Sequence, residues 1–130
     1  MVLAKLTKHR DFGLLILRAG LGISMMIHGF PKVMGGKDAW TGLGESVGLP
    51  APIVFGILAA LTEFLGGLML AAGLYFRIAC ILLACLMAGA LTYHLKAGDD
   101  FNNYSHAMEL LIIFVALIFI GPGKYSVDKE

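Results

Sequence analysis

Ionisable side chains interrupt long apolar stretches of this 130-residue chain. A charged side chain at the centre of a membrane-spanning helix costs about 2.5–3.5 kcal/mol on insertion scales, so such residues are rare unless they pair or line a polar cavity. They therefore mark a candidate site within the membrane. The residues of this kind are Arg18, His28, Glu63, His94, His106 and Glu109.

Polar residues near one end of the stretches form a predicted outer layer. His28 and Lys32 are four residues apart, and His106 and Glu109 are three apart, so each pair shares one face of a helix. An up-and-down order of spans brings them to the depth of His94 and of two phenols, toward the non-cytoplasmic face. The layer consists of His28, Lys32, Tyr93, His94, Tyr104, His106 and Glu109.

The residues of this layer are either interfacial groups bonded to lipid headgroups or backbone, or they form a site. Three kinds of chemistry fit such a site. A quinone headgroup needs a hydrogen-bonding group at each carbonyl oxygen and a source of protons, which we assign to Glu109, His94 and His106 as catalytic residues. A metal would need His28, His94, His106 and Glu109 to converge on one point. A bis-histidine haem would need two facing imidazoles, and no CxxCH motif is present. We expect neither metal nor haem; for the quinone, the binding residues are His28, Lys32, Tyr93 and Tyr104.

A second polar pair is expected deeper in the membrane. Arg18 lies about 8 Å and Glu63 about 15 Å from the cytoplasmic end of their spans, at a helical rise of about 1.5 Å per residue. A guanidinium can bridge that difference, and ionisable groups in membranes commonly pair. The pair either fixes helix register or lets Glu63 carry protons.

Composition and span length predict the fold. The chain is 58% hydrophobic and 15% charged, which sets it apart from soluble domains. Its apolar runs are continuous rather than alternating, which favours helices over a barrel. We predict an all-α transmembrane four-helix bundle that forms a single membrane domain over residues 1–130. The spans cover about 13–33, 52–74, 76–95 and 104–120, and a glycine-rich interfacial loop covers 34–51, either a plain loop anchored by Trp40 or a flap over a site.

Small residues and cysteines add two further expectations. Gly56 with Ala60 and Gly67 with Ala71 are spacings that permit close helix packing and association into a homo-oligomer. Cys80 and Cys85 are five residues apart in one span, so their Cα atoms lie about 8.6 Å apart, too far for a disulfide.

The order of four motifs resembles the DoxX family of small four-helix membrane proteins. The motifs are His28-Gly29 with Lys32, Glu63 with Gly66-Gly67, MAGALTYHL, and GPGKYSVD at the end, and the resemblance runs from Phe12 to Asp128. It implies a link with the membrane subunits of thiosulfate and quinone oxidoreductases, or with resistance to quinones and oxidative stress. It does not supply a family active site.

Two functions are therefore kept. In the first, the chain is a quinone-interacting subunit or accessory of a membrane oxidoreductase, and a redox partner protein supplies electrons because the chain has no flavin, iron–sulfur or haem motif. In the second, it is a non-catalytic scaffold or a small-molecule transporter. In both, it is a multi-pass protein of the inner membrane in contact with the lipid bilayer, with no nucleic-acid partner expected.

Both termini are predicted to be cytoplasmic, because an even number of spans places them on one side and positive charge favours that side. Six Lys and Arg residues lie on the terminal side and three on the other. Cysteine-accessibility labelling should find probes at Val2 and Asp128 on the same face of the membrane. Labelling from opposite faces would rule out an even number of spans.

Overall fold

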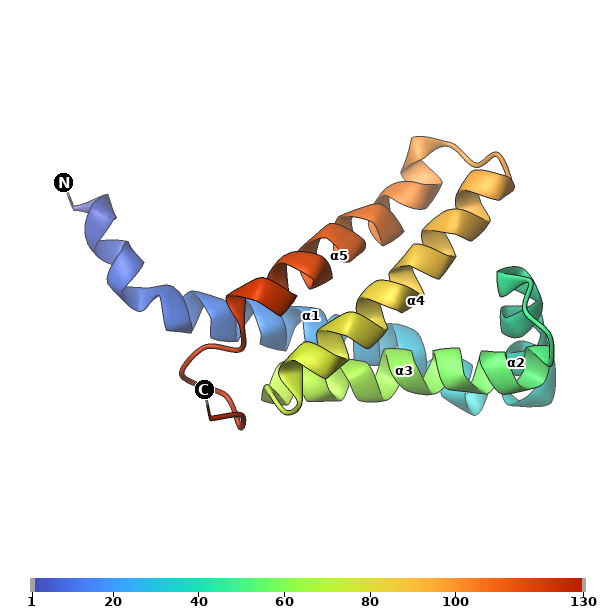
Figure 1. Cartoon of the computed structure of the whole chain (residues 1–130), viewed down its shortest axis with the longest axis horizontal. Coiled ribbons are helices and arrows are strands. Elements are labelled where there is room, and N and C mark those ends of the chain that lie inside the picture. Colours follow the sequence, from blue (N-terminus) through green and yellow to red (C-terminus); the bar gives the residue numbers. More distant parts are fainter. Residues whose placement is uncertain (1, 130) are drawn as a thin grey trace.

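The chain folds into helices joined by short turns. The computed structural model describes residues 2–129, and within that range it contains no strand. Four segments are long and apolar enough to cross a membrane, which confirms the predicted four-helix membrane fold (Figure 1). The elements are η1 (Leu3–His9), α1 (Arg10–Met34), α2 (Gly36–Val47), α3 (Pro52–Ala72), α4 (Phe76–Lys96) and α5 (Phe101–Ile120).

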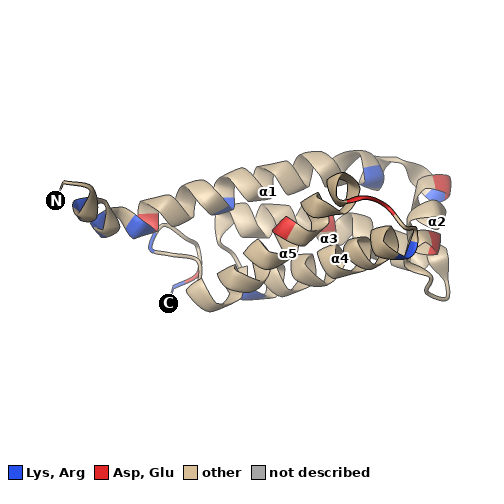
Figure 2. Cartoon of the chain, turned by 90° about the horizontal axis from the view of Figure 1, so that it is seen from above, with Lys and Arg blue, Asp and Glu red and all other residues tan. Residues whose placement is uncertain are grey.

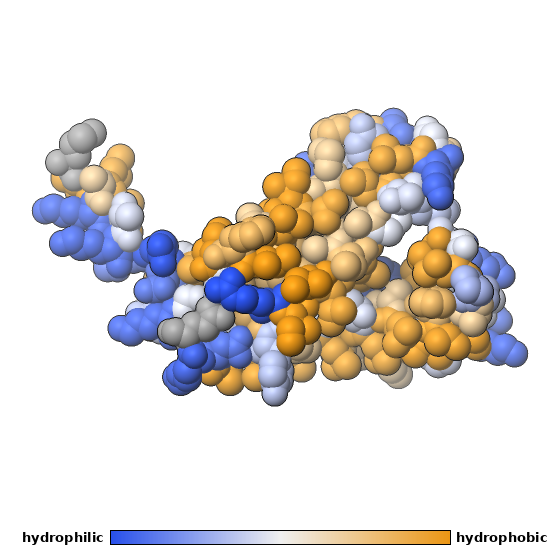
Figure 3. All heavy atoms as spheres, viewed as in Figure 1, coloured by the Kyte–Doolittle hydropathy of each residue, from blue (hydrophilic) through white to orange (hydrophobic). Residues whose placement is uncertain are grey.

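The long helices form two pairs that diverge toward one end. Helix α1 packs on α3, α4 packs on α5, and α3 with α4 joins the pairs, whereas α1 and α5 do not pack backbone against backbone. The pairs converge near the C-terminus and spread apart toward α2 and the α4–α5 turn (Figure 1). Charged residues gather mainly at the two ends of the bundle (Figure 2), and the flanks in view are mostly hydrophobic (Figure 3), as a bilayer requires.

Glycines bring α1 and α3 into close contact. A Cβ atom at Gly22 would overlap the carbonyl oxygen of Gly67 and lie 2.7 Å from the Cβ of Ala71. One end of α1 is held in the same way, because a Cβ at Gly29 would lie 2.7 Å from the backbone nitrogen of Phe64. These contacts set the register between α1 and α3, so Gly29 lies level with Glu63 and Phe64.

The segment 34–51, expected to be an interfacial loop, instead contains α2. Its glycines serve close packing: a Cβ at Gly44 would overlap the carbonyl of Pro52, and one at Gly56 of α3 would overlap the carbonyl of Trp40. The Trp40 indole donates to the carbonyl of Lys32 at 3.0 Å, close to the end of α1. The segment is therefore a helix packed on α3, and Trp40 ties it to α1.

The C-terminal motif folds back over the α3–α4 turn. The backbone nitrogen of Asp128 donates to the carbonyl of Gly73 at 2.9 Å. The Asp128 carboxylate in turn accepts from the backbone nitrogens of Tyr75 and Phe76, at 2.9 and 2.8 Å. These nitrogens belong to the start of α4, where free N–H groups and the helix dipole favour an anion. The motif is thus a clamp that holds the converging end of the bundle.

Arg18 belongs to this clamp, and its predicted pairing with Glu63 is wrong. The side chain is fully buried, and its guanidinium donates to the carbonyl of Ala71 at 3.0 Å and to that of Tyr125. The glycine contacts place Arg18 beside the last turn of α3, more than two turns away from Glu63 along that helix. Arg18 therefore satisfies free carbonyls at a helix C-terminus, a favourable position for a cation.

Candidate functional site

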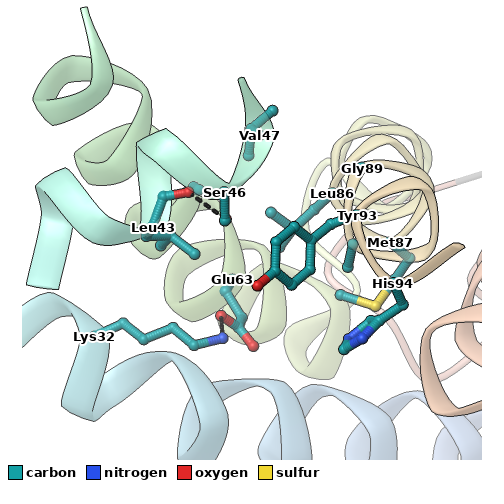
Figure 4. A pocket seen from close by; sticks show the side chains of 12 residues that line it. Lys32, Leu43, Ser46, Val47, Glu63, Leu86, Met87, Gly89, Tyr93 and His94 are labelled. Atoms are coloured by element: carbon teal, nitrogen blue, oxygen red, sulfur yellow. Dashed lines mark hydrogen bonds and ion pairs between the residues drawn. The ribbon is translucent and has the colours of Figure 1, made fainter. Parts of the chain in front are cut away.

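A cavity of about 220 Å³ lies among α1, α2, α3 and α4, on the diverging side of the bundle. Most of its lining is apolar, with side chains such as Leu86 and Met87. Polar groups from all four helices also reach it (Figure 4). A mainly apolar cavity with a few converging polar groups is the usual form of a small-molecule site. The polar lining residues are Lys32, Ser46, Glu63, Tyr93 and His94.

An ion pair between α1 and α3 forms one side of this pocket. The Lys32 ammonium lies 2.5 Å from a carboxylate oxygen of Glu63. Glu63 is the twelfth of 21 residues in α3, which places it about half-way across the span at about 1.5 Å per residue. Its side chain is 6% exposed, whereas that of Lys32 is 43% exposed. Lys32 therefore reaches inward from near the end of α1 to neutralise a carboxylate in the interior.

Tyr93 and His94 form the opposite side of the pocket. The Tyr93 phenol points toward Glu63 (Figure 4), and the His94 ring lies edge-on to that of Tyr93, with centroids 5.4 Å apart. His94 Nδ1 is 2.6 Å from a carboxylate oxygen of Asp99. A carboxylate at one ring nitrogen fixes the tautomer and orientation of an imidazole. With Asp99 accepting from Nδ1–H, neutral His94 keeps a lone pair on Nε2.

Asp99 and Ser46 are site residues that the sequence reasoning did not identify. Asp99 follows the end of α4 by three residues, and its partner is five residues away in sequence. A carboxylate just beyond a helix whose last turn carries His94 was the available signal for Asp99. Ser46 carried no such signal, because it reaches the pocket only through the packing of α2.

The rest of the predicted outer layer lies elsewhere. The rings of His28 and His106 approach each other, with centroids 5.5 Å apart, across the gap between α1 and α5. Glu109 is exposed one turn further along α5, and Tyr104 packs edge-on against Phe101. None of these four predicted site residues is among those that line the pocket. Within residues 2–129, no three His, Cys, Asp or Glu side chains gather closely enough to hold a metal ion.

The ion pair predicts an energetic coupling between Lys32 and Glu63. Free energies of unfolding of Lys32→Met, Glu63→Gln and the double variant should show a coupling of about 1–2 kcal/mol, because one change leaves the other group unpaired. Partial exposure of Lys32 keeps the value below that of a fully buried pair. Arg18→Met and Glu63→Gln should instead add within about 0.5 kcal/mol. Coupling of Glu63 to Arg18 but not to Lys32 would contradict this geometry.

Comparison with known proteins agrees with the architecture. The family model described as DoxX matches residues 13–95. A Bacillus subtilis protein named "Putative oxidoreductase CatD" is 36% identical, over 95% of this chain and 90% of its own. The Escherichia coli inner membrane proteins YphA and YqjF are 26% and 28% identical, over 95% and 94% of this chain and 97% and 94% of their own. No solved structure matches.

The matched family model covers more than half of the chain, and CatD matches nearly all of it. Helices of membrane-spanning length and the names of the two Escherichia coli relatives give the location. The chain is a multi-pass inner membrane protein and belongs to the DoxX family.

Proposed function

We propose that this protein is the quinone-interacting membrane subunit of an oxidoreductase system, and that the quinone ring binds in the cavity among α1–α4. The observation that carries this proposal is the convergence of Lys32, Glu63, Tyr93 and His94 on a mainly apolar cavity inside the membrane. The name of the Bacillus subtilis relative, "Putative oxidoreductase CatD", supports it. Electrons are supplied by a partner protein in this proposal.

The lining suits a flat ring with an oxygen at each end. Lys32 and Tyr93 offer donors beside Glu63, and His94 offers a ring nitrogen beyond them, whereas Met87, Leu86 and Ala59 offer apolar walls. The cavity, at about 220 Å³, is smaller than the roughly 300–1,000 Å³ of pockets for larger ligands, which favours a single ring over a flavin or a haem. A bound quinone would supply two-electron, two-proton chemistry.

The residues of the chain would orient the ring and manage protons. Glu63 holds the Lys32 side chain at the cavity, where its ammonium can donate to a ring oxygen. The Tyr93 hydroxyl can donate to the same region of the cavity. As the ring is reduced by electrons from the partner, His94 Nε2 can take up a proton from the membrane surface and pass it to a ring oxygen, and Asp99 stabilises the charged imidazole in between. Because the side chains of His94 and Asp99 are 31% and 33% exposed, they also connect the pocket with the membrane surface at the α4–α5 turn.

Binding of a tail-less quinone analogue tests this proposal. Glu63→Gln and His94→Ala should each weaken binding about tenfold or more, equivalent to about 1.4 kcal/mol. The first change removes the carboxylate that holds Lys32 at the cavity, and the second removes a group that positions the ring. Glu109→Gln is the matched control: it makes the same change of a carboxylate to an amide on α5, outside the pocket lining, and should alter affinity less than threefold.

Equilibrium dialysis of purified protein in detergent, with gel filtration to verify folding, provides the measurement. Unchanged binding in the Glu63 and His94 variants, or loss of binding in Glu109→Gln alone, would move the site away from this cavity. Absence of binding to the unmodified protein would favour the scaffold or transporter function.

A further inference from the structure

A second, strongly apolar cavity adjoins the polar pocket. It has a volume of about 370 Å³ and lies between α3 and α4, bordered by the end of α2. The two cavities adjoin each other, because four residues line both of them. The shared residues are Val47, Ala59, Leu86 and Gly89, three of which are labelled in Figure 4.

Two facing helical stripes build this apolar groove. Phe55, Leu58, Ala59 and Thr62 follow the i, i+3, i+4, i+7 spacing along α3, and Leu82, Cys85, Leu86 and Gly89 repeat it along α4. Residues at that spacing share one helix face. The large side chains of the groove are not buried, since Leu58 is 52% and Leu82 is 44% exposed. In a membrane-spanning bundle such a groove faces hydrocarbon.

A cavity of the opposite character also adjoins the polar pocket. A third cavity, of about 270 Å³, is lined by Ser46, Thr92 and Lys96 and reaches the polar rim of α4. Gly89 lines all three cavities, and a Cβ atom there would meet nothing within 4 Å. The helix thus presents open space where the three cavities meet.

We propose that the ligand of the polar pocket carries a long isoprenoid tail, which lies along the α3–α4 groove and leaves into the bilayer. The inference rests on the proposed function and narrows its substrate class to lipid-soluble quinones, as opposed to water-soluble rings. The ring lies in the polar pocket beside Lys32, Glu63 and Tyr93. The tail passes Gly89 into the α3–α4 groove. A hydrocarbon tail takes the apolar exit because the Lys96 exit would expose it to water and charge.

A native cysteine reports on the groove. Cys85 lines it and is exposed, whereas Cys80, the other cysteine, is buried. Alkylation of Cys85 by a membrane-permeant maleimide, followed by mass spectrometry, should slow at least tenfold when a saturating tailed quinone is bound. A tail-less quinone should change the rate less than twofold. Both rings must be fully substituted, so that they do not add to the thiol.

Substitution of Gly89 tests the same path independently. Gly89→Leu should lower affinity for the tailed quinone at least tenfold more than affinity for the tail-less one, because the leucine fills the junction. Gly20→Leu is the matched control: it also makes a glycine-to-leucine change in a helix where a Cβ meets nothing within 4 Å, but on α1, and should affect neither. Affinities are expressed as mole fractions in the detergent, because the tail partitions into it.

The outcomes separate the two proposals. If neither quinone binds the unmodified protein, the proposed function fails and this inference fails with it. If both bind but the tailed one leaves Cys85 as reactive as before, the tail lies elsewhere and only the inference is overturned. Slow alkylation of Cys85 that no quinone alters would mean that lipid or detergent holds the groove, which also overturns the inference.

Discussion

A carboxylate about half-way across a membrane needs a cation, and the ion pair of Glu63 with Lys32 supplies it. Lys32 can reach that depth only because glycine contacts set α1 against α3 with Gly29 level with Glu63. The end of α1 is then held by the Trp40 indole, which binds the carbonyl of Lys32 itself. The pair, the helix register and the position of α2 depend on one another, and together they form one wall of the pocket.

The two ends of the bundle differ in packing: one is closed by the C-terminal segment, and the other contains the cavities. At the converging end, Arg18 donates to carbonyls of the last turn of α3 and of the C-terminal segment, and Asp128 accepts from backbone nitrogens at the start of α4. Together they hold the C-terminal segment against the α3–α4 turn. At the diverging end, the helix pairs separate, and the space between them becomes the pocket and its neighbouring groove. The hydrogen bonds of the clamp thus join the helix pairs at the end opposite the cavity.

The sequence predicted the membrane fold, but not which polar side chains would face one another. Hydropathy and span length suffice for the helices. Arg18 and Glu63 appeared close because their depths were counted from span ends, whereas Gly22, Gly67 and Gly29 set the true register. His106 and Glu109 belong to α5, none of whose residues line the pocket. The glycines of 34–51 indicated a loop because close helix packing and flexible turns favour the same residue.

Solid-state NMR on the protein in bilayers would test the central claim most directly. A tail-less quinone with ¹³C-labelled carbonyls and a protein with ¹⁵N-labelled histidine allow carbon–nitrogen distances to be measured by dipolar recoupling. The four histidines of the chain include one in the pocket, His94, and two at the α1–α5 gap, His28 and His106. We expect recoupling of the quinone carbonyl carbons to the ring nitrogens of His94 alone. Recoupling to His28 and His106, with none to His94, would contradict it.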